Sequence, residues 1–197
     1  MTFFEKLKKY DIILASKSPR RQQLLKQTQI PFRVVTKSVS ESFDGSLKPE
    51  QIVLKLCLSK ANAYNELFAK RNTLLIAADT IVHINGQVLN KPGNKQETER
   101  MLEILSGSVH DVFTGVCIKT ASKEKTFFEK TSVEFEKLTK EEILFYLENF
   151  KPFDKAGGYG IQEWIGLIAI KRIEGSYHNV VGLPVARLYK EMKDFVE

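Results

Sequence analysis

Hydrophobic and polar positions along this chain follow two patterns, which alternate from the first strand to the last helix. Short apolar runs and every-second-residue alternation predict strands, whereas apolar residues three to four positions apart predict helices. The first three elements are strand, helix and strand, so the chain opens with a βαβ unit. The predicted strands cover residues 11–16, 32–39, 73–84, 87–92, 111–120, 126–138 and 164–173. The predicted helices cover residues 19–28, 49–70, 95–107 and 140–150, and a last helix begins near Pro184.

Turn and cap residues support several of these boundaries. Asn85 and Gly86 predict a type I′ hairpin between two strands. Gly107 is placed to end a helix, and Thr139 with Glu142 forms a capping box at the start of another. Strands that alternate with helices predict an α/β fold with three layers, in which helices cover both faces of a mixed sheet. There is neither an internal repeat nor a linker, so we expect one domain over residues 1–197.

The composition is that of a globular chain with a basic excess. Its 197 residues are 43% hydrophobic and include six prolines, enough to bury a real core. Thirty basic and 24 acidic residues give a net charge of +6, but they are spread along the chain and form no basic stripe. A small anionic ligand therefore suits the charge as well as a nucleic acid does, and we expect no stable nucleic-acid partner.

Cysteine and histidine show no metal-ligand spacing. Cys57 and Cys117 fall inside predicted regular elements, and we expect both to be buried thiols in a reducing compartment. His83, His110 and His178 are scattered, so each is predicted to be structural or to lie at the surface.

No stretch of the sequence has the pattern of a targeting or membrane segment. Charged residues interrupt the first apolar positions of MTFFEKLKKYD, which argues against a signal peptide. No run approaches about 18 uninterrupted apolar residues, so no membrane span is expected. A cytoplasmic protein is the expectation.

Two arginines stand in the first turn of a predicted helix. Ser18 is a favourable N-cap and Pro19 suits the first helical position, which places Arg20 and Arg21 next to the positive end of the helix dipole. A bound phosphate would make this arrangement favourable. The alternatives are solvated arginines, pairing with acidic side chains, a nucleic-acid contact, or a kinase site.

Asp79 and Lys60 are charged residues in apolar surroundings. Asp79 interrupts the run LLIAADTIV, where an unpartnered carboxylate would cost several kcal/mol. It is either a polar group bonded to a neighbouring turn or a metal ligand or general base at the carboxyl end of a strand. Lys60 falls in the apolar stripe of the helix at 49–70, where it must extend into solvent or meet an anion.

Glu41 in a polar loop and Lys91 after the hairpin are ordinary surface charges when taken alone. Together with Arg20, Lys60 and Asp79 they form a consistent set. The cations would bind a polyphosphate, and the carboxylates would bind Mg²⁺ and activate water.

Six motifs, in order from residue 12 to residue 185, give the chain a resemblance to a known family. They are ILASKSPRRQQLL, AADTIV, NGQVLNKP, SGSVHDVFTGV, KAGGYGIQ and EGSYHNVVGLPV, and together they resemble the Maf nucleotide pyrophosphatases. The resemblance implies a three-layer α/β fold with an elongated sheet and a deep central cleft, a cytoplasmic location and a homodimer. It also implies hydrolysis of nucleoside triphosphates to monophosphate and pyrophosphate with a divalent metal, Mg²⁺ or Mn²⁺, and an association with arrest of cell division.

The same resemblance implies roles for individual residues. Asp79 matches the proton acceptor, and with Glu41 it would hold the metal. The residues that match the phosphate-binding turn and the charged lining of the cleft are Ser16, Arg20, Arg21, Glu41, Lys60 and Lys91.

The branch of the family that prefers dTTP and UTP resembles this chain at Arg20, Thr80 and Gln162. A glutamine amide offers one donor group and one acceptor, which suits the O4 and N3–H of a pyrimidine. The chain departs from the family in IQEW, where Glu163 and Trp164 follow the glutamine in place of the usual glycine, and in an alanine of AADT.

Two other functions stay open on the sequence. One is a pyrophosphatase for modified or purine triphosphates, because the same phosphate-binding residues would serve it. The other is a regulator of cell division that senses a nucleotide, or a DNA-contacting protein, which would bind without turnover.

Overall fold

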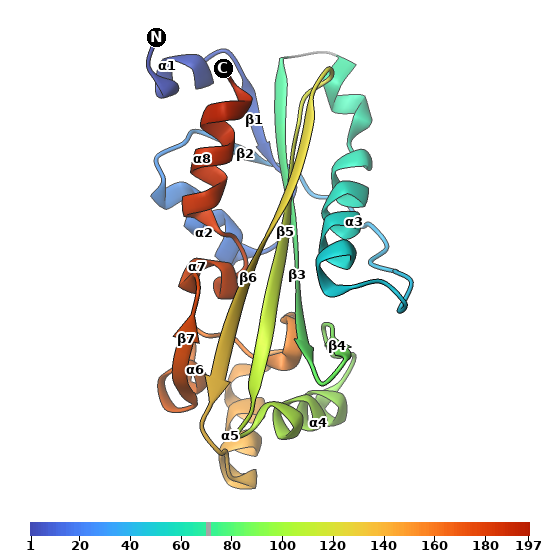
Figure 1. Cartoon of the computed structure of the whole chain (residues 1–197), viewed down its shortest axis with the longest axis vertical. Helices are drawn as coiled ribbons and strands as arrows, with labels where there is room; N and C mark the ends of the chain where they lie inside the picture. Colours follow the sequence, from blue (N-terminus) through green and yellow to red (C-terminus); the bar gives the residue numbers. More distant parts are fainter. Residues whose placement is uncertain (70–71) are drawn as a thin grey trace. The chain divides into compact units, whose positions relative to one another are not determined.

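The computed structural model describes residues 1–69 and 72–197 and confirms the mixed α/β class (Figure 1). Among these residues, the strands pair in the order β2-β1-β3-β5-β6-β7, and β4 pairs with β3. The strands are β1 (Asp11–Leu14), β2 (Arg33–Val34), β3 (Thr73–Ile84), β4 (Gln87–Leu89), β5 (Val109–Lys119), β6 (Glu124–Phe135) and β7 (Ile170–Glu174). The α-helices are α1 (Phe3–Leu7), α2 (Pro19–Gln27), α3 (Pro49–Asn62), α4 (Lys95–Leu105), α5 (Lys140–Phe150), α6 (Trp164–Ile168), α7 (Tyr177–Val181) and α8 (Val185–Phe195). Two 3₁₀ helices are η1 (Asn65–Ala69) and η2 (Ala156–Gly158).

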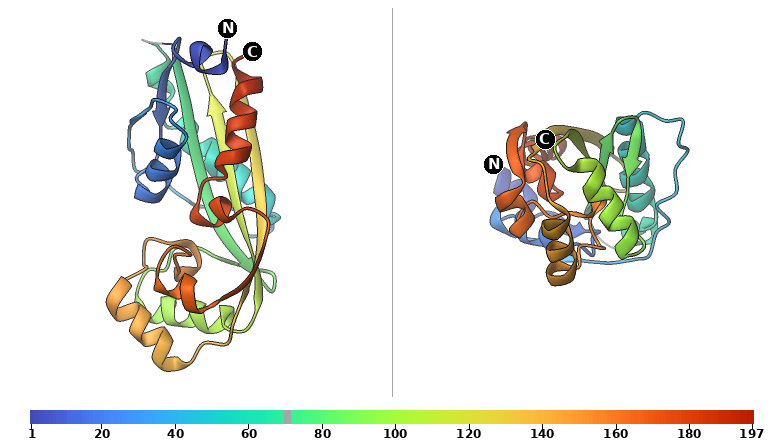
Figure 2. Two further views of the ribbon diagram at one scale, coloured as in Figure 1. Left: turned by 90° about the vertical axis from the view of Figure 1, so that its left-hand side faces the viewer. Right: turned by 90° about the horizontal axis from the view of Figure 1, so that it is seen from below.

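The chain divides into two compact units. Unit 1 consists of Met1–Asp79, Thr114–Glu129 and Gly182–Glu197, and unit 2 consists of Thr80–Phe113 and Lys130–Val181. In unit 1, β1 pairs in parallel with both β2 and β3, which confirms the predicted βαβ opening. Helices α2 and α8 cover one face of these strands and α3 covers the other (Figures 1 and 2). The single domain over residues 1–197 and the deep cleft stay predictions.

In unit 2, helix α4 contacts α5 and η2, and β7 pairs antiparallel with β6. Asn85 and Gly86 both have positive φ angles, as the type I′ hairpin between β3 and β4 requires. The capping box of Thr139 and Glu142 is present at the start of α5, and Gly107 has a φ of 65° after α4. These local predictions are confirmed.

The predicted strand over residues 164–173 is wrong in its first half. Residues 164–168 form α6, and β7 begins only at Ile170. A Cβ on Gly166 would lie 1.8 Å from the carbonyl oxygen of Ile161, so this turn of helix packs directly on the preceding backbone. A short apolar run fits a buried strand and a buried helix equally well, and here the close approach that Gly166 permits favours the helix.

Other boundaries also differ from the prediction. β2 has two residues rather than eight, and the helix predicted over residues 49–70 ends at Asn62, where a turn at Ala63 leads into η1. The predicted end of that helix, Lys70, lies outside the described residues. The five-residue helices α1 and α7 carry no hydrophobic period long enough to predict them.

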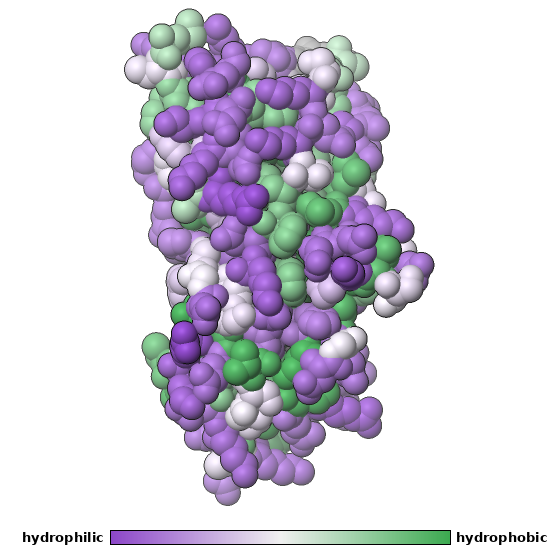
Figure 3. Space-filling view, viewed as in Figure 1, coloured by the Kyte–Doolittle hydropathy of each residue, from purple (hydrophilic) through white to green (hydrophobic). Residues whose placement is uncertain are grey.

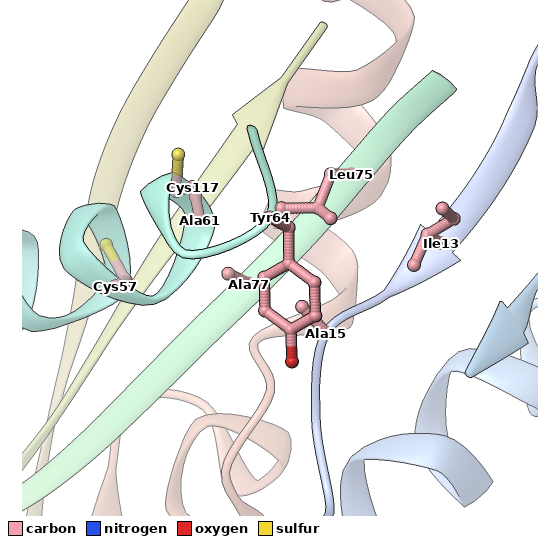
Figure 4. Close-up of a cluster of buried hydrophobic side chains, with 8 residues drawn as sticks. All are labelled: Ile13, Ala15, Cys57, Ala61, Tyr64, Leu75, Ala77 and Cys117. Atoms are coloured by element: carbon pink, nitrogen blue, oxygen red, sulfur yellow. The ribbon is translucent and has the colours of Figure 1, made fainter. Parts of the chain in front are cut away.

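A buried apolar cluster joins α3 to the strands of unit 1. Figure 4 shows its members, which are Ile13, Ala15, Cys57, Ala61, Tyr64, Leu75, Ala77 and Cys117. Both cysteines are buried and free, as predicted. Burial raises the pKa of both thiols, that of Cys117 to about 12, so both stay protonated and unreactive near neutral pH.

Polar side chains cover most of the face drawn in Figure 3, with smaller hydrophobic areas between them. None of the helices in the described part of the chain has the length and apolar character needed to cross a bilayer.

Candidate active site

The turn before α2 is fixed by two serines. The Ser18 side chain accepts a hydrogen bond from the backbone N–H of Arg21 at 3.4 Å, and Pro19 is the first helical residue. The hydroxyl of Ser16, which is buried, accepts from the Ser18 N–H at 3.2 Å. The predicted cap is therefore confirmed, and the four residues 15–18 connect the end of β1 to the start of α2.

Arg21 is held by backbone carbonyls of unit 1. Its Nε donates to the Gly182 oxygen at 2.7 Å, and its Nη1 donates to the Ala78 oxygen at 2.9 Å. Burial lowers the pKa of the guanidinium, and the negative charge of Asp79 acts in the opposite direction. Arg21 therefore ties α2 to β3 and to the segment before α8, a structural contact that sequence reasoning missed. Arg20, its neighbour, is half-buried.

Lys60 joins two carboxylates. Its Nζ lies 3.0 Å from Asp79 Oδ1 and 2.8 Å from Glu41 Oε1. The side chain of Asp79 is 5% exposed and that of Lys60 is 14% exposed, so Lys60 does not extend into solvent. Of the two alternatives left open by the sequence, the structure shows the second, in which Lys60 meets an anion, and its partners are side chains of the same chain.

The position of Asp79 follows from the sheet. The parallel pairing of β1 with β3 ends at Leu14 and Ile76, whereas β3 continues to Ile84. Asp79 therefore lies inside β3 but beyond the carboxyl end of its parallel neighbour. That edge is where open α/β sheets usually place their ligands.

The other three predicted residues belong to unit 2. Thr80 follows Asp79 along β3 and is half-buried, and Lys91 is exposed after β4. Gln162 is exposed in a turn closed by a 2.9 Å hydrogen bond from the Glu163 N–H to the Gly160 oxygen. The structure thus brings Ser16, Arg20, Arg21, Glu41, Lys60 and Asp79 into unit 1 and leaves Thr80, Lys91 and Gln162 in unit 2.

The carboxylates fit a metal that binds together with a polyphosphate. Over residues 1–69 and 72–197 no group of three or more histidine, cysteine or acidic side chains could hold a metal ion. Glu41 and Asp79 nevertheless converge on one cationic group, Nζ of Lys60. Mg²⁺ typically takes one or two carboxylates and completes its shell with phosphate oxygens and water, so two such ligands suffice.

Comparison with known proteins assigns the chain to a family. The profile of the family described as "Maf-like protein" matches residues 11–195. The chain belongs to the Maf family. The resemblance seen in the six sequence motifs is thereby confirmed.

Maf relatives match the chain over nearly their whole length. A protein of Porphyromonas gingivalis named dTTP/UTP pyrophosphatase is 48% identical over 195 residues, covering 98% of each chain. A protein of Parabacteroides distasonis with the same name is 50% identical over 192 residues, covering 97% of this chain and 99% of the relative. The corresponding protein of Christiangramia forsetii is 47% identical over 193 residues, covering 98% and 97%.

Among solved structures, the Staphylococcus aureus Ham1 protein matches with a TM-score of 0.44 and 16% identity. The match covers 64% of this chain and 71% of that one. A similarity at this level has no bearing on the site.

Proposed function

We propose that the chain is a dTTP/UTP pyrophosphatase, which hydrolyses a nucleoside triphosphate between its α and β phosphates. The observation that carries the proposal is the buried carboxylate of Asp79, bridged by Lys60 to Glu41, in a Maf chain. Relatives that are 47–50% identical to it over nearly the full length are named for this activity.

The phosphates would bind at the start of α2. The helix N-terminus presents backbone N–H groups and a partial positive charge, and Arg20 adds a full one. Lys60 and Lys91 supply further positive charge to the triphosphate. Cations held in fixed positions stabilise the negative charge that develops on the leaving pyrophosphate.

Asp79 would act as the general base. Its carboxylate takes a proton from the water whose oxygen forms the new bond to the α phosphorus. The bond from that phosphorus to the bridging oxygen of the β phosphate breaks, and pyrophosphate leaves with the electron pair. Mg²⁺ or Mn²⁺ held by Glu41, Asp79 and phosphate oxygens would supply charge neutralisation when it is bound.

Gln162, Thr80 and Arg20 would select the pyrimidine. The amide of Gln162 can donate to O4 of the base and accept from N3–H. The exposure of Gln162 leaves its amide accessible to a ligand. The cytoplasmic location and the homodimer that the family resemblance implies stay predictions.

The first test is pyrophosphate release from a panel of canonical and modified triphosphates with Mg²⁺ or Mn²⁺. We expect release from dTTP and UTP, and a loss of kcat of about 10²- to 10⁴-fold in Asp79→Asn with little change in KM. Asp194→Asn, which changes an exposed aspartate of α8, is the matched control and should keep full activity.

Other outcomes would support the other candidate functions. Pyrophosphate release only from purine or modified triphosphates would show that the pyrimidine preference is wrong, while the pyrophosphatase reaction would still be supported. Nucleotide binding without release by folded wild-type protein would favour the sensor. DNA affinity that falls steeply between two salt concentrations in a gel shift would favour the DNA-contacting protein.

A further inference from the structure

Gln162 lies in a four-residue turn with one buried and one exposed central residue. The turn runs from Gly160 to Glu163 and is closed by the hydrogen bond between their backbones. Ile161 is buried at 7% exposure, and Gln162 is exposed. The turn is therefore anchored through Ile161 and directs Gln162 outward.

Both ends of this turn bond to one tyrosine hydroxyl. Tyr146, fully buried on α5, accepts a hydrogen bond from the Gly160 N–H at 3.0 Å. The same hydroxyl donates to Oε2 of Glu163. One group thus fixes the first and the last residue of the turn that carries Gln162.

A buried lysine holds the other oxygen of Glu163. Nζ of Lys155 lies 3.0 Å from Glu163 Oε1, and the side chain of Lys155 is 8% exposed. The same ammonium contacts Asp154 at 2.6 Å. Both carboxylate oxygens of Glu163 are therefore engaged, one by a charge and one by a hydroxyl.

The ion pair packs against the backbone of the turn. A Cβ on Gly160 would lie 2.8 Å from Cδ of Glu163 and 3.0 Å from Cε of Lys155. A Cβ at this position would force the Glu163 carboxylate or the Lys155 stem to shift. The side chains of Glu163 and Lys155 thus restrict the turn sterically as well as by hydrogen bonds.

Stability alone is a poor explanation for such a pair. In a largely buried ion pair, the attraction between the two charges offsets little more than the free energy needed to remove them from water. What it does provide is one defined geometry, because both carboxylate oxygens of Glu163 and the Tyr146 hydroxyl are already engaged. The residue whose geometry it defines is Gln162, directly before Glu163.

We propose that Tyr146, Glu163 and Lys155 are positioning residues that set nucleobase selectivity by fixing the turn that presents Gln162. The inference rests on the proposed function, since it needs Gln162 to contact the base. It also gives a role to Glu163, which stands where the family resemblance leads one to expect glycine. In this chain a side-chain carboxylate does the positioning.

A double-mutant cycle with Tyr146→Phe and Gln162→Ala tests this. Tyr146→Phe removes only the hydroxyl, and Tyr177→Phe, at an exposed tyrosine of α7, is the matched control. We expect Tyr146→Phe to raise KM for UTP about tenfold with kcat nearly unchanged, which corresponds to about 1.4 kcal/mol. The ratio of kcat/KM for UTP to that for ATP should fall by the same factor. In the Gln162→Ala background, Tyr146→Phe should cause no further fall, because the two changes act through one contact.

A second pair of variants keeps the test decisive if Tyr146→Phe does not fold. Glu163→Gln keeps an acceptor for the Tyr146 hydroxyl but loses the charge, and Lys155→Met loses the ammonium. We expect both to lower the UTP to ATP ratio as well.

Two results would overturn the proposal. One is an equal loss of activity on UTP and ATP, as a general structural role would give. The other is that Tyr146→Phe lowers the UTP to ATP ratio of kcat/KM as much in the Gln162→Ala background as in the wild-type background. Wild-type protein that releases pyrophosphate from no triphosphate would instead overturn the proposed function, and the two failures are therefore distinguishable.

Discussion

Arg20 and Arg21 are neighbours in the first turn of α2, yet the structure gives them different environments. Arg21 donates to two backbone carbonyls, those of Ala78 and Gly182, which belong to buried residues. Both arginines are half-buried, and no such pair of carbonyl contacts is described for Arg20. Two residues that look alike in the sequence therefore differ in the structure: backbone carbonyls hold Arg21 in place, whereas Arg20 is the one for which we propose phosphate binding.

Replacing each arginine by alanine should separate these roles. In Arg21→Ala two buried carbonyls lose their donors, so we expect the free energy of unfolding to fall by roughly 2–4 kcal/mol. Arg20→Ala should cost less stability than Arg21→Ala and raise KM for the triphosphate. Urea unfolding and steady-state kinetics on both variants measure the two effects. Equal stability of the two variants would contradict the structural role of Arg21.

His110 provides a second prediction at the scale of one residue. Burial lowers its pKa from 6.5 to about 4, and its Nε2 lies 2.8 Å from the Tyr159 hydroxyl. In the unfolded chain the imidazole binds a proton near pH 6.5, but in the folded chain only near pH 4. The unfolded state therefore holds more protons between these values, and the free energy of unfolding should fall by about 3 kcal/mol as pH drops across them.

Urea unfolding across that pH range, with His110→Gln beside wild type, measures this contribution. Glutamine does not titrate and can still bond the Tyr159 hydroxyl, so the slope of stability against pH should be shallower. His178→Gln changes an exposed histidine and should keep the wild-type slope. An unchanged slope in His110→Gln would contradict the effect of burial.

At the scale of helices and strands, the packing of α3 on β5 depends on a glycine. A Cβ on Gly115 of β5 would lie 2.3 Å from the carbonyl oxygen of Val53 on α3. The helix backbone therefore lies directly against the strand. This contact helps to place Lys60, which lies two turns further along α3.

Gly115→Ala should force α3 away from β5. We expect a loss of about 1–3 kcal/mol in the free energy of unfolding, as overpacking of a core typically costs. Gly45→Ala is the matched control, because a Cβ there meets nothing within 4 Å. Thermal unfolding of the two variants gives the comparison, and equal midpoints would show that the contact relaxes without cost.

Elements whose signals are local could be predicted from the sequence. The capping box of α5, the Asn85–Gly86 hairpin and the long apolar run of β3 need only neighbouring residues to be recognised. The run after Glu163 could not be assigned, because its helix depends on the approach of Gly166 to the Ile161 carbonyl. The shortness of β2 could not be predicted either, because the length of a strand depends on how many of its residues pair with a neighbouring strand, and β2 pairs with β1 at two positions.

Residues of the candidate site likewise include some that local sequence indicates and others that only the fold shows. Asp79 and Lys60 could be found because a charge in an apolar pattern is visible in the sequence. The carbonyl partners of Arg21 lie 57 and 161 residues away along the chain, so no local pattern indicates them. Lys155 and Tyr146 look like an ordinary loop lysine and a helix aromatic until the fold brings both to Glu163.

At the scale of the whole molecule, two cations of the chain itself, Lys60 and Arg21, act on the carboxylates of Asp79 and Glu41. Lys60 pairs with both Asp79 and Glu41, so the two carboxylates have a cationic partner without any metal. Folding and metal binding should therefore be separable. The net charge of +6 suits an anionic substrate whether or not a metal is bound.

Chelation of divalent metal should abolish pyrophosphate release and leave the protein folded. We expect the same unfolding midpoint with and without EDTA in the absence of nucleotide, because Lys60 pairs with both carboxylates and the charge of Arg21 also acts on them. Thermal unfolding and the activity assay on the same samples measure both quantities. A large drop in the midpoint with EDTA would mean that a metal supports the fold.

The hydrogen bond between Arg21 and Gly182 can form only late in synthesis of the chain. The two residues are 161 positions apart, and both segments of unit 2 lie between them. At a translation rate of roughly 5–20 residues per second, Gly182 is synthesised about 8 to 30 s after Arg21. All of unit 2 has been translated by then, so the unit that begins first is completed last. During that interval the nascent α2 lacks the backbone carbonyl of Gly182, which accepts a hydrogen bond from Arg21 in the folded chain.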